Sequence, residues 1–279
     1  MSKLCTAGGE RPTRVGLGGE GVLRTQGREG EAASVIIEAL EQGLTYFDSA
    51  PAYAGSQSYY GSVWRERPEV RAGVFQASKS AGRTRDAALA DLEQTLRIMG
   101  LDYLDLWQIH DLRTAGEFET VSGPGGALEA FVEARQSGRV RFIGVTGHHD
   151  PDLLTRAVEA WPVDAVLLPV NPAEACLGGF LDLTVAAARK RGAAVIGMKA
   201  LGGSHYVSPE GGLTADRLLR FALAQPVDHL VVGCGLPVEV MELALAGRVP
   251  EPMSPAEREA LVQTFRPRAR RLAFYRGGA

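Results

Sequence analysis

The chain has 279 residues, of which 45% are hydrophobic and 23% are charged, the balance of a folded globular protein. A formal net charge of −3 offers no basic field to a phosphate backbone, and no apolar run reaches the about 20 residues of a membrane span. Nucleic-acid binding and membrane insertion are therefore disfavoured.

Residues 1–6 carry no apolar signal core, and the cysteines are too far apart for a disulfide framework or a zinc site, so we expect a cytoplasmic protein.

Short apolar segments rich in β-branched residues alternate with helix-like segments along the whole chain. The predicted strands are 14–17, 45–48, 74–78, 104–109, 142–145, 165–168, 194–198 and 229–232. The predicted helices are 32–42, 85–99, 127–136, 151–160, 181–191, 215–224 and 238–246, and a glycine follows most of their ends. Strands flanked by helices on both sides are parallel and buried, and eight such units predict a closed (β/α)8 TIM barrel. A doubly wound open sheet is the alternative.

The segment from Glu251 onward departs from this repeat. Ser254 stands three residues before Glu257 with a proline between them, which predicts the start of a C-terminal helix. The end of the segment is basic, and we expect its arginines to lie in solvent or to complement the helix dipole, with a phosphate contact as the alternative. These arginines are Arg266, Arg268, Arg270 and Arg271. No long linker interrupts the chain, so we predict a single barrel domain over 1–279, with the tail 251–279 packed on it.

The segment GLGGEG at 16–21 matches the glycine pattern of a dinucleotide-binding fold and follows the first predicted strand. That pattern works only when a helix begins at its last glycine, so that the helix N-terminus holds the pyrophosphate. Residues 22–28 intervene here before the first helix. We therefore expect a wide loop that lies close to a ligand.

Four polar residues are predicted at the C-terminal ends of barrel strands, where the active sites of such barrels lie. Asp48 closes the second strand, Tyr53 follows in the next loop, Lys79 ends the third strand and His110 ends the fourth. Each alone is more simply explained as a helix cap or a core residue than as a functional group. Together they form a chemical device, because an ammonium lowers the pKa of a phenol and a carboxylate keeps the ammonium charged. An imidazole could then hold a carbonyl oxygen beside the phenol, and a nicotinamide could supply a hydride.

These residues resemble the signature of the aldo-keto reductases. The likeness rests on YFDSAPAYAGS at 46–56, on SK at 78–79, on QIH at 108–110 and on GVT at 144–146, and it runs from about Val15 to Ala246. It implies a single barrel, NADP(H) bound across its mouth, and reduction of a small-molecule aldehyde or ketone. It also implies that Tyr53 is the general acid, that Asp48 and Lys79 tune it, and that His110 orients the substrate.

The cofactor loops depart from the family pattern. After the fifth strand, Thr146-Gly147 stands where the family usually has Ser-Asn, and Asn171 could replace the usual glutamine after the sixth. Glu239 stands among the residues that usually hold a 2′-phosphate, which a carboxylate would repel, so NAD(H) is possible beside the family default NADP(H). Glu242 matches the position expected to meet the adenine. The predicted cofactor-binding residues are Gly18, Gly19, Asp48, Thr146, Gly147, Asn171, Met198, Lys199, Gly233, Cys234, Gly235, Glu239 and Glu242.

Other candidates have simpler explanations. The pair His148-His149 resembles a metal site, but adjacent histidines are expected to point in different directions and Asp150 is explained as a helix cap, so we predict no metal. One of these imidazoles could still reach the cofactor or substrate. Lys199 could contact cofactor phosphates or pair with a neighbouring loop, and the loop 111–126 could be a mobile lid. The predicted substrate-pocket residues are Leu23, Tyr53, Trp64, His110 and Tyr206.

Two other functions stay open. The first is a barrel that keeps nucleotide binding but acts as a redox-responsive interaction module, which the altered cofactor loops suggest. The second is a lyase in which Lys79 forms a Schiff base, although Asp48 would keep that lysine charged and unreactive. The sequence indicates neither the physiological substrate nor the oligomeric state.

Overall fold

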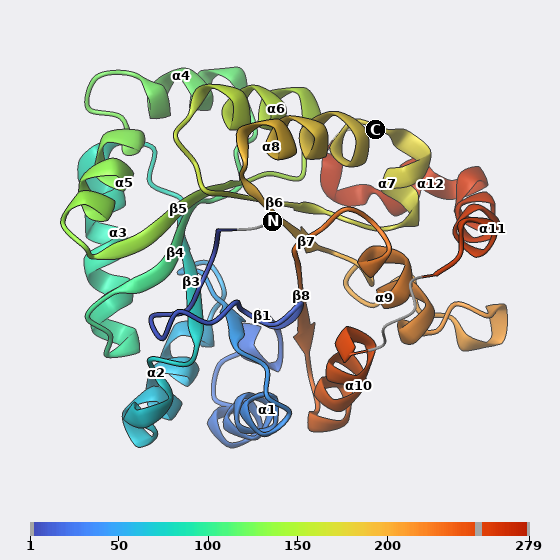
Figure 1. The fold of residues 1–279 in the computed structure, drawn as a ribbon, viewed down its shortest axis with the longest axis horizontal. Coiled ribbons are helices and arrows are strands. Elements are labelled where there is room, and N and C mark those ends of the chain that lie inside the picture. Colours follow the sequence, from blue (N-terminus) through green and yellow to red (C-terminus); the bar gives the residue numbers. More distant parts are fainter. Residues whose placement is uncertain (1–2, 249–252, 278–279) are drawn as a thin grey trace.

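The computed structural model describes residues 3–248 and 253–277 (Figure 1). Eight parallel strands close into a barrel in the order β1 to β8, and the helices surround it, so the (β/α)8 prediction is confirmed. The predicted tail boundary at Glu251 lies outside the described residues, as do Met1 and Ser2. The strands are β1 (Val15–Gly21), β2 (Tyr46–Asp48), β3 (Phe75–Ser80), β4 (Leu104–Ile109), β5 (Val140–Thr146), β6 (Ala165–Pro169), β7 (Ala194–Met198) and β8 (His229–Cys234).

The helices also follow the predicted order, with three that the sequence pattern missed. Those three are α2, α4 and α7, and no helix within the described ranges has the length and apolarity that a bilayer span needs. The helices are α1 (Glu29–Glu41), α2 (Ser56–Glu66), α3 (Arg85–Met99), α4 (Ala115–Ser122), α5 (Ala127–Gln136), α6 (Pro151–Ala160), α7 (Pro172–Leu177), α8 (Val185–Arg191), α9 (Ala215–Leu223), α10 (Pro237–Arg248), α11 (Pro255–Phe265) and α12 (Ala269–Leu272).

The glycine-rich segment 16–21 is a strand, not the wide loop expected from the sequence. β1 continues to Gly21, and a 3₁₀ turn at Val22–Arg24 follows it. A Cβ on Gly233 of β8 would lie only 2.5 Å from Cβ of Glu20, so a residue without a side chain is needed where the two strands approach. These glycines serve strand packing, and the segment does not open a dinucleotide-binding helix.

The core has two layers. Side chains such as Tyr46, Phe75 and Leu106 fill the barrel interior, and Leu4 of the N-terminal segment packs with them. A larger cluster lies between the strands and the helices, with Phe47 and Trp107 pointing outward from their strands. Because the interior is filled with apolar side chains, polar side chains can gather only at the ends of the strands.

The C-terminal helix α11 begins with the predicted capping box. The Ser254 hydroxyl accepts from the Glu257 N–H (3.3 Å), and the Glu257 carboxylate accepts from the Ser254 N–H (2.8 Å). Phe265 of α11 packs edge-on against Tyr206 in a third apolar cluster, which joins this helix to the barrel. Beyond α12, the buried Glu174 of α7 holds the chain end through ion pairing with Arg276 and a 2.8 Å hydrogen bond from the Tyr275 hydroxyl.

Candidate active site

The structure brings Asp48, Tyr53, Lys79 and His110 together at one end of the barrel. The Lys79 Nζ donates to Asp48 Oδ2 at 2.5 Å and to the Ser49 carbonyl oxygen at 2.9 Å. It also lies 4.7 Å from the centroid of the Tyr53 ring. The Tyr53 and His110 rings meet edge to face, with their centroids 5.6 Å apart. A phenol, an ammonium, a carboxylate and an imidazole therefore share one small volume.

Strand register explains this convergence. Asp48 is the last residue of β2 and pairs with Ala77 of β3, so Lys79 lies two residues further along β3 on the same face. Lys79 in turn pairs with Gln108 of β4, whose amide nitrogen approaches Asp48 Oδ1 at 3.5 Å. His110 follows β4 directly, and its N–H donates to the Ser80 carbonyl of the neighbouring strand.

Burial sets the protonation of the phenol. It raises the pKa of Tyr53 above its ordinary value, and the Lys79 ammonium opposes this rise without overcoming it. Lys79 thus lowers the pKa of Tyr53 as the sequence predicts, but burial, which the sequence did not reveal, raises it by more. The phenol is protonated at neutral pH and is ready to act as an acid.

The other three groups also have shifted pKa values. Burial lowers the pKa of Lys79, but Asp48 and Tyr53 outweigh it, so the pKa of Lys79 is raised and the amine stays charged. Burial also raises the pKa of the Asp48 carboxyl, against the effect of Lys79. The pKa of His110 falls to about 3, first because of burial and then because of the Lys79 charge. His110 is therefore a neutral imidazole at neutral pH, able to donate one hydrogen bond.

Gly19 of β1 supports the position of Tyr53. A Cβ on Gly19 would lie 2.6 Å from Cδ2 of Tyr53 and 2.8 Å from the Ser56 hydroxyl oxygen. Any larger residue would therefore push the tyrosine ring out of place. Gly18, by contrast, faces the backbone of Val232 and Gly233 in β8.

The predicted cofactor residues on β5 and β7 lie at the same end of the barrel. Thr146 ends β5, and its hydroxyl accepts from the Asp111 N–H at 2.7 Å, while Gly147 follows it. Met198 ends β7, and Lys199 follows with its Nζ 5.3 Å from the centroid of the Tyr275 ring. Within the described part of the chain Lys199 forms no ion pair, so the neighbouring-loop pairing considered above is absent there. Its ammonium is available to an anion.

Asn171 has a different role from the one considered above. Its amide nitrogen already donates to the Lys199 carbonyl (3.1 Å) and to the Tyr275 hydroxyl oxygen (2.8 Å). Its amide oxygen caps α7 by accepting from the Glu174 N–H. Because both amide protons are used and the side chain is fully buried, Asn171 has none left for a cofactor carboxamide.

In the loop after β8, backbone N–H groups bind the side-chain carboxylate of Glu239. Glu239 Oε2 accepts from the N–H groups of Gly235 (2.5 Å) and Leu236 (3.3 Å), at the start of α10. Cys234 next to them is buried, whereas Gly233 is partly exposed and Glu242 is exposed on α10. The carboxylate of Glu239 thus occupies a helix N-terminus, the kind of place where proteins bind phosphate groups.

Three predicted pocket residues lie in the core instead. Leu23 and Trp64 belong to the apolar layer between barrel and helices, and the Trp64 indole donates to Gln76 Oε1 at 3.0 Å. Tyr206 is buried against α11, and its hydroxyl donates to the Leu272 carbonyl at 2.7 Å. The sequence suggested that these three residues lie on loops at the mouth, but their apolar side chains pack into the core instead. Of the predicted pocket residues, only Tyr53 and His110 lie at the site.

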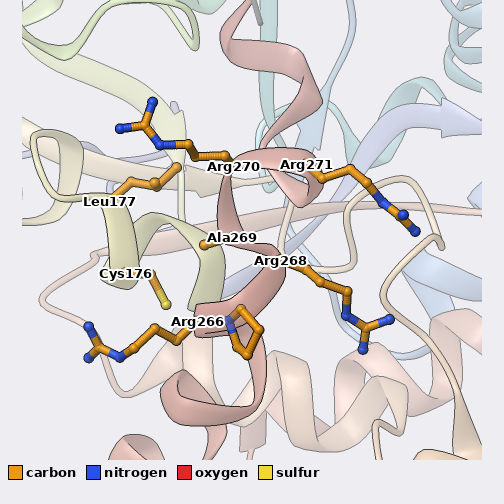
Figure 2. A pocket seen from close by; sticks show the side chains of 8 residues that line it. Cys176, Leu177, Arg266, Arg268, Ala269, Arg270 and Arg271 are labelled. Atoms are coloured by element: carbon orange, nitrogen blue, oxygen red, sulfur yellow. The ribbon is translucent and has the colours of Figure 1, made fainter.

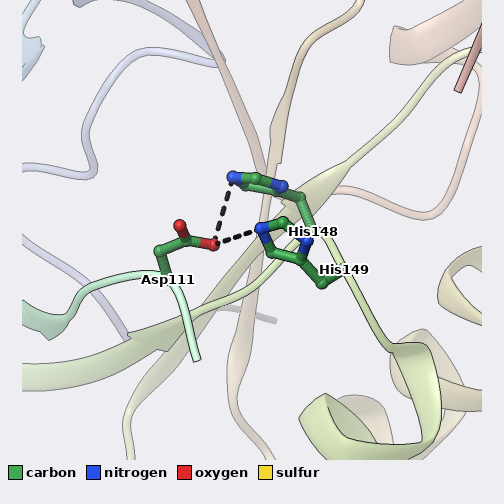
Figure 3. A group of neighbouring side chains, drawn as sticks. All are labelled: Asp111, His148 and His149. Carbon is green, nitrogen blue, oxygen red and sulfur yellow. Dashed lines mark ion pairs between the residues drawn. The ribbon is translucent and has the colours of Figure 1, made fainter. Parts of the chain in front are cut away.

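The two histidines differ from the prediction, whereas the lid role of the loop 111–126 stays a prediction. The loop contains helix α4, which Thr114 caps by accepting from the Glu117 N–H at 3.1 Å. His148 and His149 do not point apart; their ring centroids lie 4.4 Å from each other, and both face Asp111 (Figure 3). Asp150 caps α6 as expected, accepting from the N–H groups of Asp152 and Leu153.

A basic cavity of about 500 Å³ lies between α7 and the C-terminal segment (Figure 2). Cys176 and Leu177 line one side of it, and the four predicted arginines of the tail line the other. Figure 2 shows these side chains spreading in different directions, and all four arginines are exposed, as expected for solvated residues. None of the residues Asp48, Tyr53, Lys79 and His110 lines this cavity.

Sequence reasoning missed four residues at or beside the site. Gln108 contacts Asp48, and Glu20 pairs with Arg24, whose guanidinium lies 5.4 Å from the centroid of the Tyr53 ring. Asp111 joins the two histidines. The position of Gln108 in β4, two residues before His110 and so on the same strand face, was the one available signal.

Comparison with known proteins agrees with this geometry. A model of the Aldo/keto reductase family matches residues 14–208. An aldo-keto reductase from Mycolicibacterium smegmatis is 30% identical over 52% of this chain, and L-galactose dehydrogenase from Arabidopsis thaliana is 29% identical over 50%. These matches cover 50% and 46% of the relatives, so the chain spans about half the length of the curated relatives it matches.

Solved structures show the same fold. An aldo-keto reductase from Klebsiella pneumoniae in complex with NADPH is 17% identical, with a TM-score of 0.76 over 95% of each chain. A thermostable aldo-keto reductase, Tm1743, solved with the inhibitor epalrestat, is 23% identical, with a TM-score of 0.73 over 91% of this chain and 96% of that one. The family match over more than half of the sequence, together with the barrel, leads to one conclusion: this chain belongs to the aldo/keto reductase family.

Proposed function

We propose that this chain reduces an aldehyde or a ketone to an alcohol, with a nicotinamide nucleotide as cofactor and Tyr53 as the general acid. The observation that carries the proposal is a protonated phenol that lies over a buried ammonium–carboxylate pair and edge-on to a neutral imidazole. Membership of the aldo/keto reductase family supports the reaction class.

In the proposed reaction, His110 donates a hydrogen bond to the carbonyl oxygen and holds it beside Tyr53. When bound, the nicotinamide nucleotide supplies the hydride, which no side chain can provide. As the carbonyl carbon gains its new C–H bond, the C=O π electrons move to oxygen, and Tyr53 donates its hydroxyl proton to that oxygen. The Lys79 ammonium stabilises the phenolate that remains, and solvent returns the proton to Tyr53.

Residues at the mouth fit a nucleotide. The Lys199 ammonium has no ion pair among the described residues and could bind a phosphate group. By contrast, the N–H groups at the start of α10 already bind the Glu239 carboxylate. Thr146, Gly147 and Met198 would line the same surface, and Cys234 would lie behind it.

The lyase alternative is disfavoured, because Lys79 is fully buried and paired with Asp48.

The test of the general acid is Tyr53→Phe, which removes the hydroxyl and keeps the ring. We expect kcat for a reactive aldehyde to fall by about 10²–10⁴-fold, the usual contribution of a general acid, while cofactor binding is retained. Tyr103→Phe is the matched control, because Tyr103 lies just before β4, at the opposite end of the barrel, and stacks on Arg71. Full turnover by Tyr53→Phe would refute the assigned acid. Tight cofactor binding by the wild type without turnover of any carbonyl would favour the interaction-module alternative.

We further propose that Glu239 favours NADH over NADPH. Its carboxylate occupies the N-terminus of α10, so a 2′-phosphate would have to displace it and would be repelled by it. In parallel titrations that follow tryptophan fluorescence, Glu239→Ala is expected to tighten NADPH binding by roughly threefold to tenfold and to leave NADH binding almost unchanged. Glu41→Ala is the control, because it removes an exposed carboxylate at the end of α1, outside the predicted cofactor site. Equal effects on both nucleotides would contradict the proposal.

A further inference from the structure

We propose that Asp111, His148 and His149 form a binding site for a divalent transition-metal ion of the Zn²⁺ type. Asp111 follows His110 directly, so the site lies at the mouth of the barrel beside the proposed reductase site (Figure 3). The proposal does not depend on the reductase activity.

The three side chains have the spacing of metal ligands. Asp111 Oδ1 lies 3.1 Å from His148 Nε2 and 3.5 Å from His149 Nε2, and one ligand atom from each residue lies within 4.8 Å of the other two. Zinc binds imidazole nitrogen and carboxylate oxygen at about 2.0–2.2 Å, which separates neighbouring ligands of a tetrahedron by roughly 3.3–3.6 Å. One ion would therefore fit between the three atoms with small adjustments.

Hydrogen bonds on the far side of each ring fix the tautomers. His148 Nδ1 lies 2.9 Å from the Tyr275 carbonyl oxygen, and His149 Nδ1 lies 3.2 Å from the Arg276 carbonyl oxygen. Because a carbonyl oxygen only accepts, each Nδ1 carries a proton, and a neutral ring then presents the lone pair of Nε2 toward Asp111. This arrangement, an Nδ1–H group on a backbone carbonyl and a free Nε2, is the one that metal-binding histidines use.

Two of the three atoms that face each other have no hydrogen-bond partner among the described residues. These two atoms, Asp111 Oδ1 and His149 Nε2, are buried, and Asp111 as a whole is only 9% exposed. A carboxylate oxygen and two imidazole lone pairs all accept, so none of them can satisfy another. A cation placed between them would satisfy all three at once.

The neighbouring charges limit the affinity without blocking the site. Arg113 donates to Asp111 Oδ2 at 2.7 Å, which leaves Oδ1 directed at the histidines. Two imidazoles and one carboxylate suit Zn²⁺, Co²⁺ or Ni²⁺, whereas Mg²⁺ and Ca²⁺ prefer oxygen ligands. The His148 and His149 side chains are 19% and 21% exposed, which leaves room for a water ligand.

The experiment uses the full chain without an affinity tag and with Co²⁺ as the spectroscopic probe. We expect about one equivalent of Co²⁺ to bind with visible d–d absorption, Zn²⁺ to displace it, and Zn²⁺ to raise Tm. His149→Ala is expected to weaken Co²⁺ binding at least tenfold. His205→Ala is the matched control, because His205 is exposed and lies outside the cluster.

A second variant separates metal binding from folding. In Asp111→Asn the amide group can donate to one imidazole Nε2 and can still accept from Arg113, so the fold should be kept without the metal. We expect this variant to retain its Tm in chelator and to lose the Co²⁺ absorption. The proposal is overturned if the wild type shows no stoichiometric Co²⁺ absorption, or if Asp111→Asn and His149→Ala bind Co²⁺ as the wild type does.

Discussion

Lys79 carries a full charge inside a barrel whose interior is otherwise filled mainly by apolar side chains. Its side chain is 1% exposed, and two of its three N–H groups donate hydrogen bonds to the Asp48 carboxylate and to the Ser49 carbonyl. Burying such a pair costs solvation that the pairing only partly returns, so the pair stabilises the fold weakly at best. The pair is therefore better explained by function than by stability: the third N–H group and the positive charge of Lys79 can stabilise the Tyr53 phenolate.

Gly19 offers a direct test of how tightly Tyr53 is held. In Gly19→Ala the new Cβ would lie 2.6 Å from the Tyr53 ring, so we expect the ring to shift and kcat to fall at least about tenfold, since small misplacements of a reacting group are costly. The measurement is kcat with a reactive aldehyde, together with Tm.

Gly30→Ala provides the matched control. A Cβ at Gly30, in the first turn of α1, meets nothing within 4 Å. We expect Gly30→Ala to leave kcat unchanged and to be neutral or slightly stabilising. If Gly19→Ala behaves in the same way, Tyr53 is not held by this contact.

The depressed pKa of His110 predicts a pH-dependent stability. Its pKa is about 3 in the folded protein against 6.5 for a free histidine, so the unfolded chain binds more protons between these values. The free energy of unfolding should therefore fall as pH drops below about 6.5, by about 2 kcal/mol from this residue alone at about pH 5.

Urea unfolding at pH 7 and at about pH 5 measures this contribution. In His110→Gln the titrating group is gone, so the loss of stability between the two pH values should be smaller than in the wild type by about 2 kcal/mol. His205→Gln is the control, since it changes an exposed histidine. An unchanged pH dependence in His110→Gln would show that His110 is not buried as a neutral group.

At the scale of elements, the predicted helices that matched had clear end signals. The Thr84 cap of α3 and the Asp150 cap of α6 both accept hydrogen bonds from the first helical turn. The helix α2 was missed because its sequence is polar and contains Gly61. The structure gives that glycine a reason, since a Cβ there would lie 2.4 Å from the Ile98 carbonyl oxygen at the end of α3.

Gly61 therefore sets the distance between α2 and α3. We expect Gly61→Ala to lower the free energy of unfolding by about 1–3 kcal/mol, because the helices must move apart, although alanine favours helix formation. Ser62→Ala is the control, as Ser62 is the exposed neighbour on the same helix. Chemical denaturation of both variants gives the comparison, and a Gly61→Ala variant as stable as Ser62→Ala would contradict the close approach.

At the scale of the whole molecule, the segment that carries Tyr275 and Arg276 reaches back to the mouth of the barrel. Glu174 anchors Tyr275 and Arg276, and the backbone carbonyls of these two residues hold His148 and His149. We propose that the described tail and the barrel form one domain, because α11 packs on α7 and closes an apolar cluster with α9. No local pattern connects residues more than 100 positions apart, so this link was not predictable.

The sequence alone was enough to predict the barrel, with an open sheet as the alternative, and to predict that Asp48, Tyr53, Lys79 and His110 meet. Alternating strands and helices allow few topologies, and strand ends in a closed parallel barrel must meet at one mouth. Which loop residues reach that mouth depends on packing and hydrogen bonds that become visible in the folded molecule. Burial took Trp64 and Tyr206 into the core, and internal hydrogen bonds engaged Asn171 and Glu239. His148 and His149 both face Asp111 in the folded protein. Their orientation could not be predicted, because the orientation of a loop side chain depends on partners that are distant in the sequence.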